Sequence, residues 1–549
     1  MIRRIRWQAV TAVLGAALLL GVMTYLAYTT TTVVVPEEGG TYVEGVAGRP
    51  SHINPLLSGF NRVDSDLVAL VFSGLTKVDE GGRVEPDLAI EWDVSDGGSS
   101  YRFRLREDVV WHDGTSFSAH DVVFTIQAIQ DPDFQGPPEL AVFWQAVQVE
   151  APDETTVLFT LPDPFAPFLT YTDLPLLPRH LLERVPARDL ARNAFNARPV
   201  GTGPFVVREV SARAATLERN PRYYGEQSRL DQLEFRFFPD YASVLDAYLE
   251  GEVDGIGGVA PRELEALRGI ETLSIYSAPM AGYELIFLNL SHPVLGQGAV
   301  RRAMHLSLDR QGLIDGILGG QGLPAYSPIL PQSWAYSREA TFLPEDPQAA
   351  ESILEEEGWA DGDGDGVREK EGVALAFTLT TDQDPYRQQI SQEIARQLEP
   401  LGFRIRIRTL PAADLVRNAL RPGSFDALVF RWARLPADPD PYEMWHSSQI
   451  PDQGQNFGGF GNRDVDEILE QARMTVDLAR RRELYVRFQE LFAQEVPAIP
   501  LYYPIYSYAV DQRVGGIQLG PVRDPSDRFA TISEWFVNIR RVTVSESEG

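Results

Sequence analysis

The sequence predicts an α/β protein, because strand-like and helix-like hydrophobic patterns alternate along its 549 residues. Residues 101–106 and 403–408 alternate apolar side chains with arginines, as half-buried strands do. Residues 122–129 and 386–401 place apolar side chains every three or four positions, as amphipathic helices do. A hydrophobic content of 44% with 23% charged residues is typical of a folded chain and excludes wholesale disorder.

Residues 1–28 predict a transmembrane anchor or an export signal. Arg3, Arg4 and Arg6 precede an uncharged stretch that would span about 33 Å as a helix, enough to cross a bilayer. The basic flank predicts that the N-terminus stays inside and that the rest of the chain is extracellular or periplasmic. A cleaved signal is the alternative, although its apolar region is usually shorter. Residues 29–41, with a Thr run, a proline and paired glycines, are predicted as a linker.

Further elements are predicted in order along the exported part. Ser118 and Asp121 resemble a capping box that begins the first helix, and Asp346-Pro347 opens another that Gly358 can end. Residues 425–432 form a mostly apolar run typical of a buried strand. Two amphipathic helices are expected after it, over residues 465–476 and 478–495. No internal repeat is found, which argues against a solenoid or propeller.

Charge and cysteine content exclude several classes of function. The chain has 78 acidic and 49 basic side chains, and its formal net charge of −29 disfavours nucleic acid as a partner. It contains no cysteine, which rules out disulfides, thiolate metal sites, a cysteine nucleophile and a lipid-modified cysteine anchor.

The sequence contains no catalytic constellation. It lacks G-x-S-x-G, H-E-x-x-H and P-loop motifs, and none of its seven histidines stands four residues from another on one predicted helix. We therefore expect no enzyme activity, no catalytic residue and no cofactor.

One segment has the chemistry of a metal site. Asp361, Asp363 and Asp365 alternate with glycines and match the first ligand positions of a calcium loop. The twelfth position of such a loop should be a bidentate Glu, but Gly372 stands there and Glu371 is one place short. The segment predicts either a structural calcium site or a solvated acidic turn.

Several motifs follow one another from about Tyr42 to Ile539. They are FSGLT from Phe72, VEPDLAIEWDVSDGGSSYRFRLREDVVWHDGTSFSAHDVVFT from Val84, VGTGPFVVRE from Val200, LERNPRYYG from Leu217, VLDAYLEGEVDGI from Val244, FLNLSHPVLGQGAVRRAMHLSLDRQGLI from Phe287 and ELYVRFQELFAQEVPAIPLYYP from Glu483. In these motifs and their order the chain resembles the extracellular solute-binding proteins of family 5, the dipeptide-, oligopeptide- and nickel-binding group that serves ABC importers.

This resemblance implies a two-lobed periplasmic-binding-protein fold of type II, a Venus-flytrap fold with an extra subdomain on the first lobe. The implied divisions are residues 42–78, 201–288 and 506–540 for lobe 1, 79–200 for the additional subdomain, 289–505 for lobe 2 and 541–549 for a tail. Strands would cross between the lobes, consistent with the absence of a long linker after Gly40.

The resemblance also implies a ligand site between the lobes. In peptide-binding relatives a strand ending in Trp-x-x-Asp runs along the ligand, and its Asp pairs with the free amine. Here Leu435 stands at the position of that Asp, so a free amine would have to be bound by Asp438 or Asp440 instead. Alternatively, Arg434 could bind a carboxylate or a sugar hydroxyl of the ligand. The segment from Ser58 to Asn61 matches the one that faces the ligand from the first lobe in these relatives. Together with aromatic side chains of Gly- and Pro-rich loops, the resemblance predicts the following ligand contacts: Gly59, Phe60, Asn61, Arg431, Trp432, Ala433, Arg434, Leu435, Asp438, Tyr442 and Trp445.

The implied function is that of a monomeric substrate-binding component of an ABC importer. It would capture an oligopeptide or similar solute and deliver it to the permease, which works with ATPase subunits. One alternative is a non-peptide solute such as an oligosaccharide or an opine, which Leu435 favours. Another, of a different class, is an anchored extracellular hydrolase or sensor.

Overall fold

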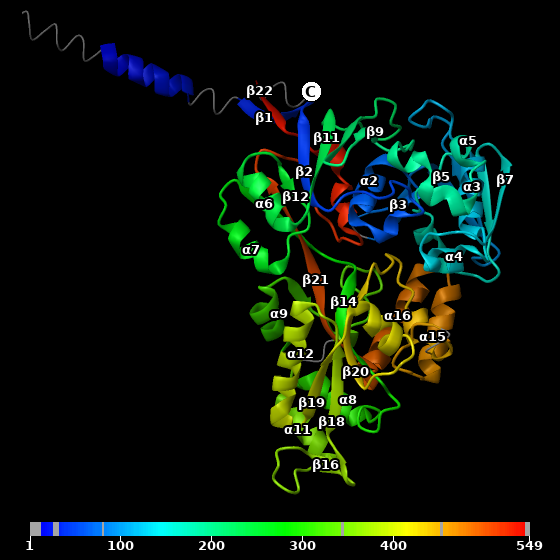
Figure 1. Cartoon of the computed structure of the whole chain (residues 1–549), viewed down its shortest axis with the longest axis vertical. Coiled ribbons are helices and arrows are strands. Elements are labelled where there is room, and N and C mark those ends of the chain that lie inside the picture. The colour runs from blue at the N-terminus through cyan, green and yellow to red at the C-terminus, as the bar shows by residue number, and fades with distance from the viewer. Residues whose placement is uncertain (1–12, 26–31, 80–81, 342–344, 451–453, 544–549) are drawn as a thin grey trace, which may run out of the picture.

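Strand β21 (Ala498–Asp511) runs through the centre of the molecule and belongs to both of its lobes (Figure 1). The computed structural model describes residues 13–25, 32–79, 82–341, 345–450 and 454–543. Residues 505–511 of β21 pair with strands of the upper lobe in Figure 1, here lobe 1, and residues 498–504 pair with strands of the lower lobe, here lobe 2. Nearly all of its side chains are buried, which explains why its sequence shows no polar alternation.

Lobe 1 is built on the part of the large sheet ordered β21-β12-β2-β11-β10-β9, with β13 also paired to β21. Its elements are β2 (Thr41–Ala47), α2 (Arg62–Val71), β9 (Phe205–Val210), β10 (Ala214–Arg219), β11 (Gln232–Phe238), α6 (Tyr241–Leu249), β12 (Gly255–Ile256), α7 (Pro261–Arg268) and β13 (Leu273–Pro279). Both β11 and β12 run parallel to β2, and α6 makes the crossover between them, as a parallel pair requires.

A subdomain between β3 and β9 packs on lobe 1 (Figure 1). Its four-stranded sheet has the order β5-β6-β8-β7. The elements of this region are β3 (Thr76–Val78), β4 (Val84–Pro86), β5 (Ala89–Ser95), β6 (Ser100–Leu105), α3 (Ala119–Gln130), α4 (Pro138–Trp144), β7 (Gln148–Asp153), β8 (Thr156–Thr160) and α5 (Arg179–Leu182). Its buried apolar side chains join those of lobe 1 in one continuous cluster.

Lobe 2 is built on the strand order β19-β18-β20-β14-β21, with β15 also paired to β21. Its elements are β14 (Gly282–Leu288), α8 (Gly298–Ser307), α9 (Arg310–Leu318), β15 (Gly322–Pro324), α10 (Arg338–Thr341), α11 (Pro347–Glu356), β16 (Glu369–Lys370), β17 (Val373–Ala374), β18 (Ala376–Thr381), α12 (Pro385–Leu398), β19 (Arg404–Thr409), α13 (Ala412–Leu415), β20 (Ala427–Ala433), α14 (Tyr442–Trp445), α15 (Arg463–Met474) and α16 (Leu478–Glu495). Separate apolar cores cover its faces, one with α8, α9, α11 and α12 and the other with α15 and α16.

The second connection between the lobes is the short link from β13 to β14. β13 pairs with the lobe 1 half of β21, whereas β14 pairs with β20 and the lobe 2 half of β21. The change of partners therefore falls at Met280 and Ala281, before β14, and not after Leu288 where the sequence placed it. A Cβ added to Gly282 would lie 2.4 Å from the carbonyl oxygen of Trp432, so the close approach of β14 to β20 at this point requires glycine.

The first and last strands, β1 (Thr32–Glu37) and β22 (Asn538–Thr543), meet beside lobe 1 (Figure 1). β1 pairs with β22, so the middle of the predicted linker is a strand, and the first residues of the predicted tail continue β22. Residues 13–25 are helical and stand away from the body (Figure 1). Their large apolar side chains are exposed. Within the described ranges, no helix combines the length and apolar character needed to span a membrane. The rest of the predicted anchor, residues 1–12 and 26–28, lies outside the described residues.

Candidate functional site

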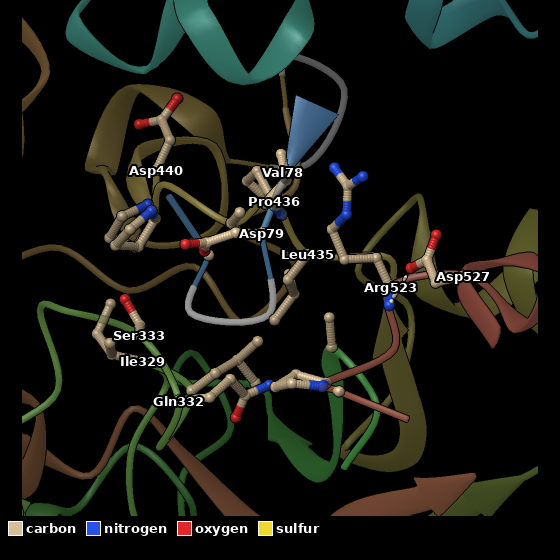
Figure 2. Close-up of a pocket in the computed structure, with 18 of the residues that line it drawn as sticks. Val78, Asp79, Ile329, Gln332, Ser333, Leu435, Pro436, Asp440, Arg523 and Asp527 are labelled. Carbon is tan, nitrogen blue, oxygen red and sulfur yellow. Dashed lines mark hydrogen bonds between the residues drawn. The ribbon is translucent and has the colours of Figure 1, made fainter. Parts of the chain in front are cut away.

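A cavity that is partly open to solvent lies between the two lobes. Figure 2 shows side chains that reach it from segments far apart in the sequence. From lobe 1 and its subdomain come Val78, Asp79, Gly82, Arg523 and Asp527, and from lobe 2 come Ile329, Gln332, Ser333, Leu435, Pro436 and Asp440. Because both lobes supply its walls, a molecule held in this cavity would contact both at once.

Proline and aliphatic side chains dominate the wall that lobe 2 contributes. The segment after β20 carries Pro436, Pro439 and Pro441, and Pro328 and Ile329 face it from another loop. Proline has no backbone N–H, so this segment offers few main-chain donors. The cavity therefore combines apolar walls with a small number of polar side chains, as small-molecule sites do.

The acidic side chains of this segment are held by arginines of α15 and α16. Asp440 accepts hydrogen bonds from Nε and Nη2 of Arg473 at 3.0 and 2.7 Å. Burial acts to lower the pKa of Arg473, but the Asp440 and Glu443 carboxylates raise it above its ordinary value. Asp438 forms a bidentate pair with Arg481 at 2.8 and 2.7 Å. Burial raises the pKa of Asp438, and Arg481 offsets only part of this increase.

Arg434 bridges the two lobes. Its Nη2 lies 2.7 Å from Oδ2 of Asp524, and its Nη1 donates to the carbonyl oxygen of Gly59 at 3.3 Å. Its backbone φ is +55°, in the left-handed region that most residues avoid. A second depression beside it is lined by residues that include Arg434, Leu435 and Arg523. Arg434 thus connects the two lobes, and its predicted contact with a ligand stays a prediction.

Among the other predicted contacts, Leu435 lines the cavity and most of the rest do not. Trp445 is buried in the lobe 2 core against Phe492, and Trp432 stacks on Phe457 with ring centroids 5.6 Å apart. Tyr442 lies beneath the guanidinium of Arg473, whose Cζ is 4.4 Å from its ring centroid.

The remaining predicted residues hold local structure or face solvent. Arg431 donates to Glu284 at 3.0 Å, and Asn61 caps α2 by accepting from the backbone N–H of Val63. Phe60 is 69% exposed, and Ala433 is also exposed.

Sequence reasoning missed the cavity residues that come from loops. Val78 ends β3 and Asp79 follows it, Gln332 and Ser333 lie in the loop after β15, and Arg523 lies in the chain after β21. The only available signal was the proline content of these loops, which does not distinguish a ligand wall from an ordinary turn.

Replacing Trp432 tests its assignment to the core. Trp432→Ala is expected to lower the free energy of unfolding by about 2–4 kcal/mol, because it removes a large ring from a packed cluster. The affinity of the Trp432→Ala protein for a mixture of synthetic peptides should stay unchanged. Leu435→Ala, at the cavity wall, should instead weaken binding by about 1 kcal/mol or more. Denaturant unfolding and calorimetric titration of both variants measure this, and the reverse pattern would place Trp432 in the ligand site.

The acidic loop of lobe 2 brings together a different trio from the one predicted. Asp361, Asp363 and Glu369 have carboxylate oxygens within 4.8 Å of one another. Asp365 instead forms an ion pair with Arg404 and accepts from the backbone N–H of Val367. Asp361 also accepts from the N–H groups of Gly364 and Gly366 at 2.7 and 3.0 Å.

Two lobes joined by crossing strands around a shared cavity define a class of ligand-binding proteins that close on a small molecule. The chain belongs to the bacterial extracellular solute-binding proteins, family 5, because the family model described as "family 5 Middle" matches residues 83–452. This is a family of binding proteins, and its members are extracellular. The fold is accordingly that of type II periplasmic binding proteins.

Similar proteins are found over most of the chain. "Oligopeptide-binding protein AppA" of Bacillus subtilis (strain 168) is 29% identical over 510 residues, which cover 91% of this chain and 92% of that protein. "Probable D,D-dipeptide-binding periplasmic protein DdpA" of Escherichia coli (strain K12) is 28% identical over 84% of this chain and 87% of that one.

Solved structures give the same picture. The structure of AppA in complex with a nonapeptide has a TM-score of 0.70 at 29% identity and covers 92% of this chain and all of that one, 100%. NikZ of Campylobacter jejuni in complex with Ni(L-His) has a TM-score of 0.72 at 28% identity, with 91% and 100% covered.

Proposed function

We propose that this chain is the extracellular solute-binding component of an ABC importer and captures an oligopeptide or a solute of similar size. The observation that carries the proposal is the cavity whose walls come from both lobes, which β21 and the link from β13 to β14 connect. The similarity to AppA and DdpA, both named for peptide ligands, supports a peptide over a sugar.

Binding works through closure and requires no chemical step. A ligand that contacts Leu435 on one lobe and the Arg523 region on the other stabilises the closed form by its greater affinity for that form. The permease then receives the ligand unaltered from the closed protein, which acts as a monomer.

A ligand panel tests this proposal. We expect a mixture of synthetic tripeptides to nonapeptides to raise the melting temperature of the purified full chain in detergent. Maltopentaose and an opine should leave it unchanged. A shift with the sugar or opine alone would assign a non-peptide solute, and hydrolysis of the peptides would indicate an enzyme.

We propose that the N-terminal segment anchors the protein in the membrane. The helical residues 13–25 expose a continuous series of apolar side chains, and a basic flank precedes the uncharged stretch. The full chain should stay in the membrane pellet after alkaline carbonate extraction, whereas a cleaved form would be found in the supernatant with a new N-terminus.

We also propose that the acidic loop binds calcium through Asp361, Asp363 and Glu369. Carboxylate oxygens are the ligands that calcium prefers, and three of them converge here. Added calcium should raise the melting temperature by a few degrees and a chelator should reverse the shift. Asp363→Asn should abolish the shift, while Glu356→Gln on the neighbouring helix should keep it. Equal melting temperatures with calcium and chelator would contradict the proposal.

A further inference from the structure

We infer that the cavity accepts a ligand segment without a charged amino terminus, namely an apolar, amide-bearing stretch such as the interior of a peptide or a blocked N-terminus. This inference rests on the proposed peptide-binding function and specifies which chemical form of peptide the site takes. Three features of the described cavity walls support it: paired carboxylates, a paired arginine and an unpaired amide donor.

The acidic side chains at the cavity wall already have partners. Asp79 forms an ion pair with Arg83 at 2.8 Å, and Asp440 is held by Arg473. Oδ2 of Asp527 accepts the backbone N–H groups of Arg523 and Asp524 at 2.7 and 3.0 Å. An incoming ammonium group would have to displace one of these partners or share its carboxylate.

Positive charge lies close to the same carboxylates. Nη1 of Arg523 is 2.7 Å from Oδ2 of Asp173, and Arg523 lies beside Asp527 in Figure 2. Burial raises the pKa of Asp527, and the Arg523 guanidinium beside it already supplies the positive charge that offsets part of this increase. Moving an ammonium group from water to this wall costs desolvation free energy. None of these carboxylates is unpaired, so none is available as a counter-ion to offset that cost.

The remaining polar group suits a neutral ligand. Nε2 of Gln332 is buried and has no hydrogen-bond acceptor in the part of the chain that the structure describes. It lines the cavity near Ile329, with Leu435 and Pro436 on other walls (Figure 2). A buried donor without a partner is costly, and the carbonyl oxygen of a ligand amide would satisfy it. Apolar ligand side chains would fill the proline-lined wall.

Matched peptides test the inference. Pairs of apolar pentapeptides that differ only by N-acetylation are titrated calorimetrically into the full chain in detergent. We expect the acetylated member to bind at least as tightly as the free one. Free peptides binding more than about 10-fold tighter would overturn the inference and leave the proposed function intact. If neither form binds while the protein is folded, the proposed peptide-binding function itself is wrong.

Variants of Gln332 separate its role from general effects on folding. Gln332→Leu should lower the affinity for the acetylated peptide about 5- to 10-fold, which is the typical effect of losing one hydrogen bond. Gln332→Glu, which keeps the shape and adds a carboxylate, should reverse the preference in favour of the free amine. Gln311→Leu, an exposed glutamine of lobe 2, should change neither affinity. Equal affinities for Gln332→Leu and the unaltered protein would contradict the assigned contact.

Discussion

Replacing Arg528 with methionine is expected to lower the free energy of unfolding by about 3–5 kcal/mol, because it leaves buried carboxylates without their cation. The Arg528 side chain is fully buried in lobe 1. Its Nη1 and Nη2 donate to Asp66 at 2.6 and 2.7 Å, and its Nη2 also donates to Glu44 at 2.9 Å. Tyr508 donates to the other oxygen of Glu44 at 2.7 Å.

An exposed arginine provides the control for this variant. Arg513 pairs with Asp511 and Asp254 but is 71% exposed, so Arg513→Met should cost less than about 1 kcal/mol. Denaturant unfolding of both variants gives the comparison. Equal losses of stability would show that the buried network in lobe 1 contributes no more than a surface ion pair.

Oxidised protein carrying Gly82→Cys and Ala437→Cys is expected to lose ligand exchange. Gly82 belongs to the turn between β3 and β4 on the lobe 1 side, and Ala437 belongs to the wall of lobe 2. A Cβ added to Gly82 would lie 3.7 Å from the Cβ of Ala437. Disulfides span Cβ separations of about 3.5–4.5 Å, so a bond can form here and hold the lobes together.

The chain has no other cysteine, which makes this experiment unambiguous. Uptake of a fluorescent peptide should stop after oxidation and return after reduction. Gly82→Cys alone should exchange normally under both conditions, because it introduces only one thiol per chain. The φ of +76° at Gly82 makes some loss of stability expected in both variants. Unchanged uptake by the cross-linked protein would show that ligand entry does not require the lobes to separate.

Local patterns in the sequence predicted individual elements well. Ser118 is the N-cap of α3, and its backbone N–H donates to Oδ2 of Asp121 at 2.9 Å, as the predicted capping box requires. The helix predicted over residues 478–495 has those bounds in the structure. These features depend on neighbours within a few residues, so short-range hydrophobic spacing and capping chemistry are sufficient to identify them.

Features that depend on distant segments were predicted poorly. The strand pairing of β14 with lobe 2, and of β1 with β22, is set by partners more than a hundred residues away. Asp438 was a candidate for a ligand amine, yet Arg481 from α16 holds it. Arg523 and Gln332 belong to no local sequence motif, and they line the same cavity only because the two lobes pack together.

The distance between the lobes tests the central claim most directly. Ala212→Cys in the exposed turn after β9 and Glu356→Cys at the end of α11 place two labels on opposite lobes of a chain without other cysteines. Single-molecule energy transfer on the full chain should show a high-efficiency population that grows as synthetic peptide is added, and mass spectrometry should recover the peptide intact. An unchanged distance at saturating peptide, or recovery of cleaved peptide, would contradict capture by closure.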